Sequence, residues 1–404
     1  MKSANPIDKF WRNLYKNSKG FEEPILISNQ YQYISTEQIL ELFGLIKQDN
    51  APGKNNYLRA YVDGNESYEL SAEIVNASPS SDLNKWLMGI FKTEKYGLVI
   101  NGPLCWSDSL GHSVDTFVEY LKNKMLKKFS IAFDLTLFIG NYGYTPFGAH
   151  LDDPDHRTLL MNLGPNDKKM ILWDPEWMRK KYGNISNYYY PEKIQDEGQI
   201  FTLKPGDMFL LPSKYYHVGY SDKYSITVAL IIKKKNPLDL MLEELKKECE
   251  SNCAKFFDTS FESAADFEKG ETSLSHYLQA NHLSTNTLLS RALKRAASNF
   301  NFLRKPNKRS TAIKIQNTTV FEPIGKLEVE SIGNKINVFC RGRKIGLPNT
   351  IQHIELIDYI NQNKSIAMDV LCDRTKLKKG FLEAFIHTLY IYKGINVVEH
   401  NKCL

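Results

Sequence analysis

A histidine and an aspartate separated by one residue, His150 and Asp152, occur in the segment GAHLDD, after a strand-like apolar run. On a β-strand, residues i and i+2 point to the same face, so the two side chains are predicted to project together. An imidazole and a carboxylate placed in this way can bind one divalent metal ion. The comparable pair His353 and Glu355 falls in a helical pattern, where positions i and i+2 diverge around the axis, and it is excluded as a chelating pair.

A second histidine, His217, ends the segment LKPGDMFLLPSKYYH (203–217), after a Pro-Gly-Asp turn, an apolar strand and a proline. A turn that begins a strand can bring a histidine at the far end of that strand back across a small barrel. Two histidines and one carboxylate leave coordination positions open, which is the facial arrangement of non-haem Fe(II) oxygenases. Taken alone, His217 could equally be an ordinary hydrogen-bonded histidine of a barrel, but the three elements together favour a metal centre.

The elements that must position these residues are strands between Ile131 and about Lys235. Gly, Pro, Asn and Asp residues separate four apolar stretches, at 133–143, 168–175, 198–212 and 224–233. This spacing indicates an antiparallel barrel or sandwich.

The residues before this region have a mixed α/β pattern. Strands are predicted at 23–29 and 96–103, and amphipathic helices at 35–46 and 113–126. The second of these helices is expected to begin near Ser113 or Asp115.

At 404 residues the chain is too long for one ordinary core. A helical section begins after Pro237 and ends at a basic, proline-containing segment, RKPNKRS, which indicates a domain boundary. We therefore predict an α+β protein of three domains. They are a barrel with an N-terminal elaboration at 1–235, a helical region at 236–308, and a winged-helix-like domain at 309–404.

The composition is that of a globular protein, with 42% hydrophobic and 24% charged residues. The first residues lack the apolar centre of a signal peptide, and the longest apolar run, 226–232, is far shorter than a membrane span. Cys249 and Cys253 have no second pair nearby that would complete a zinc site. We therefore expect a cytoplasmic protein with reduced cysteines and no membrane association.

The HxD pair, a basic residue on the next strand and the PGD turn with its distal histidine resemble the cupin-fold, Jumonji-C-type Fe(II)/2-oxoglutarate-dependent oxygenases. The segment LFIGNYGYTPFGAHLDD (137–153) is similar to the asparaginyl-hydroxylase branch. The layout of the whole chain looks closer to the ribosomal-protein hydroxylases, in which a helical dimerisation region and a winged helix follow the cupin. The resemblance implies a double-stranded β-helix (cupin or jelly-roll) core and a homodimer.

The resemblance also implies roles for individual residues. It gives three iron ligands, His150, Asp152 and His217, with 2-oxoglutarate and O2 as the cosubstrates. Lys168 would bind the distal carboxylate of 2-oxoglutarate, because a dicarboxylate buried in a barrel needs a cation at its far end. Lys169, which faces the opposite way, is the alternative. Thr145 resembles the family threonine that hydrogen-bonds the same carboxylate.

Two further positions depart from the family pattern. His156 stands where many relatives have an asparagine near the cosubstrate, and we expect it to contribute to cosubstrate binding. Ala229 replaces an asparagine on the strand after the third ligand. These differences predict that the pocket is rebuilt, or that it takes a different small acid.

Tyrosines surround the predicted mouth of the barrel, at Tyr188, Tyr189, Tyr190, Tyr215, Tyr216 and Tyr220. They could line a groove for a peptide or an amphipathic molecule, or they could be ordinary strand residues. The resemblance favours hydroxylation of an amino-acid side chain in a protein or peptide. The alternatives are oxygenation of a small metabolite and a non-catalytic cupin that serves as a binding module.

Two predicted helices bear on partners. An apolar stripe with charges opposite, which predicts a dimerisation face or packing on the chain's own barrel, comprises Leu238, Met241, Leu242, Leu245 and Cys249. The helix at 377–392 has an apolar stripe too wide for base readout and a basic cluster only at its start. Although most of the formal net charge of +6 lies after Arg309, we predict that the last domain recruits a protein or peptide and does not read DNA sequence.

Overall fold

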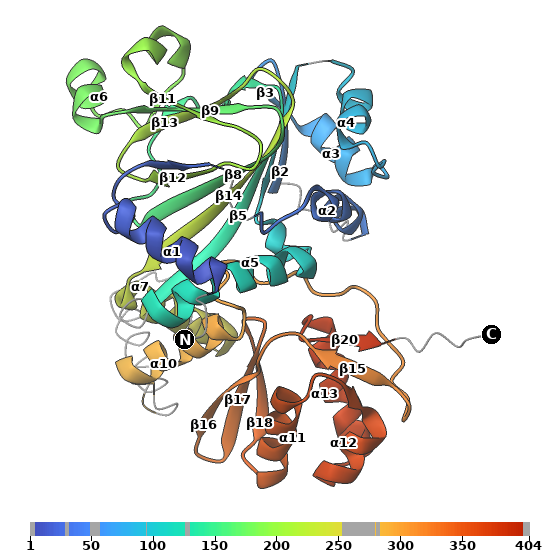
Figure 1. Cartoon of the computed structure of the whole chain (residues 1–404). Coiled ribbons are helices and arrows are strands. Elements are labelled where there is room, and N and C mark those ends of the chain that lie inside the picture. The colour runs from blue at the N-terminus through green and yellow to red at the C-terminus, as the bar shows by residue number, and fades with distance from the viewer. Residues whose placement is uncertain are drawn as a thin grey trace, which may run out of the picture. The chain divides into compact units, whose positions relative to one another are not determined.

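The protein forms two compact units, Met1–Lys234 and Lys235–Leu404, in the computed structural model (Figure 1). The structure describes residues 5–28, 32–48, 57–93, 95–125, 130–252, 279 and 283–398. The expected α+β class with antiparallel sheets is confirmed, since every strand pair with a described register is antiparallel.

An eight-stranded sheet forms the larger layer of the first unit, in the order β1-β12-β8-β14-β5-β4-β2-β3. Its strands are β1 (Ile25–Ile27), β2 (Leu58–Val62), β3 (Asn65–Ser67), β4 (Tyr96–Asn101), β5 (Ser130–Gly140), β8 (His156–Pro165), β12 (Met208–Pro212) and β14 (Ser225–Lys235).

A smaller sheet has the order β10-β7-β13-β9-β11, and β6 also pairs with β13. Its strands are β6 (Gly143–Tyr144), β7 (Ala149–His150), β9 (Lys168–Trp173), β10 (Asn187–Tyr188), β11 (Gln199–Leu203) and β13 (Tyr216–Ser221). The four apolar stretches predicted as strands all contribute to these two sheets.

The two sheets of the first unit pack face to face. One buried cluster combines Leu160 and Phe209 of the larger sheet with Met170, Leu172 and Leu203 of the smaller one. Burying both inner faces in this way supplies most of the hydrophobic stabilisation of such a sandwich. The predicted metal ligands lie between the layers.

Helices surround this sandwich, as Figure 1 shows. Their bounds are α1 (Pro6–Asn17), α2 (Thr36–Gln48), α3 (Tyr68–Asn76), α4 (Leu83–Phe91), α5 (Asp108–Tyr120) and α6 (Pro175–Tyr182), with single turns at η2 (Pro103–Cys105), η3 (Leu121–Met125), η4 (Pro191–Lys193) and η5 (Gln195–Glu197).

The helix predicted at 35–46 agrees closely with α2, whereas the predicted start of α5 does not agree with the structure. At α2, the Ser35 backbone N–H donates to the Gln38 side chain and the Ser35 hydroxyl accepts from the Gln38 backbone N–H, which is a capping box. The predicted start of α5 near Ser113 is wrong. The helix begins at Asp108, because the Ser107 hydroxyl accepts from the Leu110 backbone N–H at 3.1 Å.

The second unit contains two three-stranded sheets and several helices. Their bounds are α7 (Pro237–Asn252), α10 (Thr285–Ala297), β15 (Val320–Pro323), β16 (Glu328–Ile332), β17 (Lys335–Cys340), β18 (Arg343–Pro348), α11 (Ile351–Gln362), β19 (Ile366–Ala367), α12 (Met368–Thr375), α13 (Lys379–Ile391) and β20 (Ile395–Val398). The sheets have the orders β19-β15-β20 and β16-β17-β18. On α13 the apolar stripe is buried as predicted, and Leu382, Phe385, Ile386 and Leu389 belong to the core.

The charges of α7 do not lie where the sequence predicted. Glu244 and Glu248 are buried at 0% and 4% exposure, whereas Leu238 and Leu242 of the apolar stripe are each 54% exposed. The reason is α10, whose Arg295 guanidinium donates to both carboxylate oxygens of Glu244, at 2.6 and 2.7 Å. A buried carboxylate needs such a charged partner, and the partner lies too far along the chain to be read from α7 alone.

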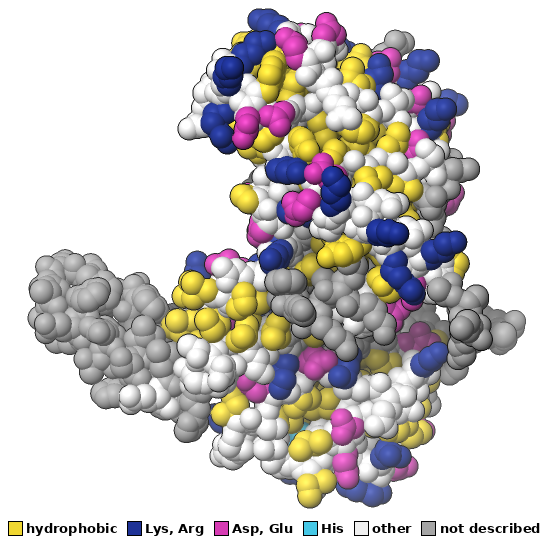
Figure 2. Space-filling model, turned by 60° about the vertical axis from the view of Figure 1, so that its left-hand side comes forward, with side chains coloured by type: hydrophobic (Ala, Val, Ile, Leu, Met, Phe, Trp, Pro, Cys, Tyr) yellow, Lys and Arg dark blue, Asp and Glu magenta, His cyan; other side chains and the backbone are white. Residues whose placement is uncertain are grey.

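The surface shows no single basic face in the view of Figure 2, where Lys and Arg side chains lie among Asp and Glu side chains. Within the described ranges, none of the helices combines the length and the apolar character needed to cross a membrane.

Candidate functional site

The two predicted histidine ligands lie on adjacent strands of the smaller sheet. His150 is the last residue of β7 and is paired with His217 near the start of β13. Their ring centroids are 4.4 Å apart. Asp152 lies beyond the end of β7, so the strand alternation expected from the sequence does not by itself bring it to the histidines. The backbone turns after β7, and this turn places the Asp152 carboxylate near the two histidines.

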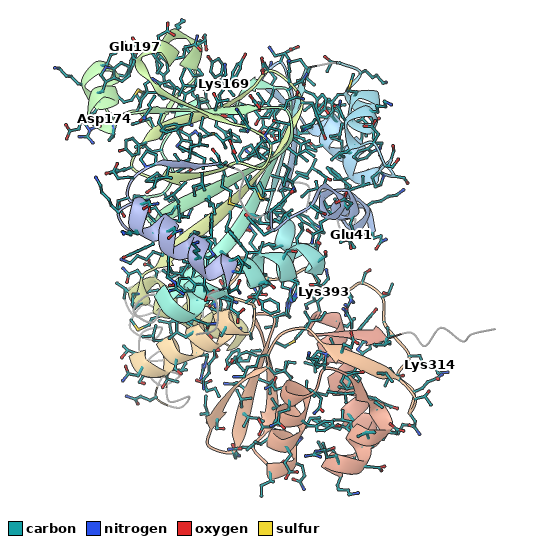
Figure 3. The ribbon with its side chains drawn as sticks, in the orientation of Figure 1. Glu41, Lys169, Asp174, Glu197, Lys314 and Lys393 are labelled. Atoms are coloured by element: carbon teal, nitrogen blue, oxygen red, sulfur yellow. The ribbon has the colours of Figure 1, made fainter. Side chains whose placement is uncertain are left out.

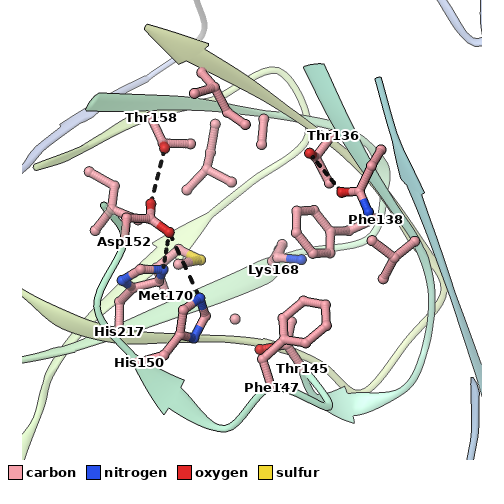
Figure 4. A pocket seen from close by; sticks show the side chains of 17 residues that line it. Thr136, Phe138, Thr145, Phe147, His150, Asp152, Thr158, Lys168, Met170 and His217 are labelled. Carbon is pink, nitrogen blue, oxygen red and sulfur yellow. Dashed lines mark hydrogen bonds and ion pairs between the residues drawn. The ribbon is translucent and has the colours of Figure 1, made fainter. Parts of the chain in front are cut away.

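The three side chains converge on one point (Figure 4). The Nε2 atom of His150 lies 3.9 Å from Oδ1 of Asp152, and the Nε2 atom of His217 lies 4.0 Å from the same oxygen. Three possible ligand atoms that lie within 4.8 Å of one another can surround a single metal ion. The other such group in the described part of the chain is Asp153, Asp155 and His156, in the turn before β8.

The outer nitrogens of both histidines face carbonyl oxygens. Nδ1 of His150 lies 3.0 Å from the Gly148 oxygen, and Nδ1 of His217 lies 3.2 Å from the Tyr215 oxygen. Because a carbonyl oxygen only accepts, Nδ1 carries the proton and the lone pair of Nε2 points to the shared centre. Burial lowers the pKa of His217 to about 4, with Asp152 opposing the shift and His150 adding to it. A neutral imidazole is the form that binds metals.

The carboxylate of Asp152 is also oriented by a hydrogen bond on its side away from the histidines. The Thr158 hydroxyl of β8 donates to its Oδ2 atom at 3.2 Å, which leaves Oδ1 facing the two histidines. Orienting bonds of this kind fix a ligand in place before the metal binds.

A cavity of about 170 Å³ extends from these three residues between the sheets. Lys168 of β9 lies in its wall, apart from the histidines (Figure 4). The side chain is 2% exposed, its Nζ donates to the Tyr142 hydroxyl, and it lies 5.0 Å from the centre of the Phe138 ring. Within the described residues no carboxylate forms an ion pair with it. A buried cation without a counter-ion is costly, and an anion bound in the cavity would offset that cost.

Thr145 lies next to this lysine and lines the same cavity. Its backbone N–H donates to the Gly219 oxygen at 2.8 Å, but its hydroxyl is buried and has no hydrogen-bond partner among the described residues. At Gly219 of β13, an added Cβ would come within 3.2 Å of the Lys168 Cε and 3.3 Å of the Thr145 Cγ2. The glycine therefore keeps open the space that the ammonium and the orphan hydroxyl share.

The other predicted site residues are placed differently. Lys169 points to the opposite side of β9 and is exposed (Figure 3). His156 is not among the residues that line the cavity, and its Nε2 atom lies 3.6 Å from an oxygen of Asp153. Ala229 does line the cavity, in an apolar stretch of its wall.

The tyrosines near the predicted mouth do not act as one group. Tyr189 and Tyr220 line a second, open groove of about 860 Å³ that also borders Thr145. The hydroxyl of Tyr215 instead donates to Glu23, and that of Tyr216 to the Ile185 oxygen.

Sequence reasoning missed several residues of the cavity wall. Gly219, Phe138 and Thr158 contact the predicted site residues or hold them in place. Thr158 could have been found from the sequence. It lies two residues before Leu160 on β8, and residues two apart on a strand point to the same face, which here is the face toward the cavity. The sequence carried no comparable signal for Gly219, since its role depends on a lysine of the neighbouring strand.

The fold of the chain is similar to that of solved ribosomal oxygenases. One solved structure that shows this is that of YcfD, a ribosomal oxygenase from Escherichia coli, in complex with cobalt and succinic acid. It has a TM-score of 0.50 and 14% identity, over 96% of this chain and 98% of that chain. An X-ray structure of E. coli ycfD has a TM-score of 0.50 and 12% identity, over 96% and 98% of the two chains. No protein-family model and no curated protein matches the sequence. The predicted resemblance to ribosomal-protein hydroxylases is thereby confirmed for the fold.

Proposed function

We propose that this protein is an Fe(II)- and 2-oxoglutarate-dependent oxygenase that hydroxylates an amino-acid side chain in a protein or peptide. The observation that carries the proposal is the cavity with two unlike ends. One end gathers two imidazoles and a carboxylate, and the other offers a buried ammonium and, among the described residues, a hydroxyl without a hydrogen-bond partner.

The residues present fit both groups. Two imidazole nitrogens and one carboxylate oxygen suit Fe(II) and leave positions open for other ligands. We assign His150, Asp152 and His217 to the iron, and Lys168 with Thr145 to the distal carboxylate of 2-oxoglutarate. When bound, iron and cosubstrate supply O2 activation coupled to decarboxylation of 2-oxoglutarate to succinate. Support comes from the YcfD structure of the same fold, which holds cobalt and succinic acid.

The tasks of the chain itself follow from its contacts. The Gly148 and Tyr215 carbonyls hold the histidine tautomers, and the Thr158 hydroxyl turns one carboxylate oxygen of Asp152 toward them. Apolar side chains, among them Val99, Phe138, Leu160 and Met170, line the walls and exclude water from the centre. Holding a substrate C–H bond in a dry, oriented site is the protein's share of such catalysis.

The proposal is tested by succinate release from 2-oxoglutarate without a prime substrate. We expect slow, oxygen-dependent release that requires Fe(II) and stops with a chelator. Metal uptake without any turnover would favour a non-catalytic cupin. Coupled turnover with metabolites but with no peptide would favour the small-metabolite alternative.

Replacing Thr145 by valine should separate cosubstrate binding from folding. Since the hydroxyl has no partner in the described part of the chain, its loss should leave the unfolding temperature of the cosubstrate-free protein unchanged or slightly higher. The binding free energy of 2-oxoglutarate should weaken by about 1.5–3 kcal/mol, the range for a hydrogen bond to a charged group, measured by titration of the metal-loaded protein.

The matched control is Thr136→Val, in the same cavity wall. The Thr136 hydroxyl already donates to Asn101 at 3.2 Å, so its loss should lower stability more and 2-oxoglutarate affinity less. If Thr136→Val weakened 2-oxoglutarate binding more than Thr145→Val did, the assignment of Thr145 to the cosubstrate site would be wrong.

We further propose that the fold comprises a double-stranded β-helix and, at 309–404, a winged-helix-like domain that recruits or orients the substrate. The two facing antiparallel sheets support the first assignment, and the buried apolar face of α13 supports a domain that does not read bases. The Arg291 guanidinium of α10 donates to Glu330 of β16 at 2.8 Å, with both side chains buried. This pair ties the proposed helical region, 236–308, to the proposed winged helix.

A homodimer through α7 is the remaining proposal about partners. Its exposed leucines support it, because Glu244 and Glu248 of that helix are already paired with arginines within the unit and leave these leucines uncovered. We expect Leu242→Glu to shift a dimer to monomer in light scattering at micromolar concentration. Val370→Glu, on the exposed side of α12, should not do so. A monomeric unsubstituted protein under the same conditions would contradict the proposal.

A further inference from the structure

Arg59 lies on the inner face of the larger sheet, at the rim of the cavity. It is the second residue of β2 and is paired with Val99 of β4, which in turn is paired with Phe138 of β5. Cross-strand partners point to the same face of a sheet. Since Val99 and Phe138 both line the cavity, Arg59 faces the same side one strand further toward the sheet edge.

A single aromatic ring lies between this arginine and the metal centre. The Arg59 guanidinium carbon is 4.9 Å from the centre of the Phe147 ring, and that ring centre is 5.9 Å from the centre of the His150 imidazole. Phe147 itself lines the cavity. A group bound at Arg59 would therefore lie one aromatic ring away from His150, and we take this side of the cavity as the mouth that a substrate uses.

The donors of Arg59 are not used within the described part of the chain. Its Nε atom is buried without a hydrogen-bond partner, and the side chain forms no ion pair there. Its contacts are with the faces of Phe147 and, at 6.0 Å, Tyr61. Glu66 is close enough to bond the Tyr61 hydroxyl, at 3.5 Å, but it does not pair with the guanidinium. A buried N–H donor without a partner is costly, so an acceptor bound at this guanidinium would be stabilised.

We infer that Arg59 binds a carboxylate of the prime substrate, either an aspartate or glutamate side chain of a peptide or the carboxylate of a small acid. The guanidinium is a planar fork that matches a carboxylate in a two-bond geometry, and its stacking on Phe147 leaves the edges of the fork free for this. One cation with Glu66 nearby suits a monoanion better than a phosphate dianion. The inference rests on the proposed function, because it assumes that the substrate reaches the metal through this mouth.

The experiment is a titration of the full-length protein loaded with Zn(II) and 2-oxoglutarate, followed through the ¹⁵N side-chain signals of its arginines. The probes are the tripeptide Ac-Gly-Glu-Gly-NH2, its neutral counterpart Ac-Gly-Gln-Gly-NH2, acetate and inorganic phosphate. The Arg59 signal is assigned by its loss in Arg59→Gln. Arg12, which also stacks on a tyrosine but is exposed on α1, serves as the internal control.

We expect a saturable shift of the Arg59 signal with the glutamate peptide by about 10 mM, which corresponds to millimolar affinity. The glutamine peptide should give no saturable shift, and the Arg12 signal should not respond. Tighter binding of the peptide than of acetate would point to a peptide substrate, and the opposite order to a small acid. Both orders support the inference.

Two results would overturn it, namely no saturable response to either carboxylate, or a stronger response to phosphate than to both. If Arg59→Gln is unfolded by circular dichroism, Arg59→Lys provides the assignment, and the titration of the unsubstituted protein still decides. Succinate release by the unsubstituted protein tests the proposed function separately. A failure there is distinguishable from a failure of carboxylate binding.

Discussion

Replacing His150 or His217 by alanine is expected to abolish stable Fe(II) binding and to lower uncoupled succinate release by at least about 100-fold. Loss of an orienting partner alone typically costs 10- to 100-fold in metal affinity or activity, so loss of a ligand should cost more. The site already leaves coordination positions open, and with two protein ligands it cannot hold the ion against chelation. Metal content after loading and desalting is the primary measurement, and succinate formation is the second.

The matched control for this pair is His112→Ala. His112 is exposed on α5 and is not part of the cavity wall, so its loss should change neither measurement. Because His217 is buried, its variant should also be compared by thermal unfolding. Full metal content in both ligand variants, with their folds intact, would remove the metal assignment.

The sequence predicted the parts of this site that depend on short spacing. His150 and Asp152 are separated by one residue, and His217 closes a turn–strand segment, so pattern alone was enough to select them. Lys168 could be named, but the choice between it and Lys169 depends on which face of β9 is turned inward. A shift of one residue exchanges the two faces of a strand, and the sequence contains no fixed reference for the register.

The parts that escaped prediction depend on pairing between distant strands. Arg59, Val99 and Phe138 form one row across β2, β4 and β5, although helices separate these strands in the chain and give no sign of the pairing. The buried acids of α7 are a second case. From the sequence alone, Glu244 is predicted to be a solvent-exposed charge. In the structure it is paired with Arg295, which lies far along the chain. A helical pattern shows which residues share a face, but it does not show which face is buried.

In the proposed function, the Lys168 end of the cavity selects the anion that the site binds. Among the described residues, the Lys168 ammonium has no counter-ion and the Thr145 hydroxyl has no hydrogen-bond partner, and both lie beside Gly219, whose missing side chain leaves room. In the protein without a ligand, the unpaired charge, the unpaired hydroxyl and the unfilled space each lower the stability of the fold. Together they support our proposal that a carboxylate binds there, and with alanine at position 229 we expect Lys168 and Thr145 to be its main polar contacts.

Replacing Lys168 by methionine, which keeps most of the volume and removes the charge, is therefore expected to weaken 2-oxoglutarate far more than metal. A hydrogen bond to a charged group contributes about 1.5–3 kcal/mol, which corresponds to roughly a 10- to 150-fold rise in the dissociation constant for 2-oxoglutarate. Metal content should stay near that of the unsubstituted protein, because Lys168 does not belong to the three-residue ligand group.

Lys169→Met is the control, since that side chain is exposed and its charge is screened by water. A larger effect at Lys169 would mean that β9 turns its other face to the cavity in solution. Equal losses of metal and 2-oxoglutarate in Lys168→Met would mean that the lysine supports the whole site and does not bind the distal carboxylate.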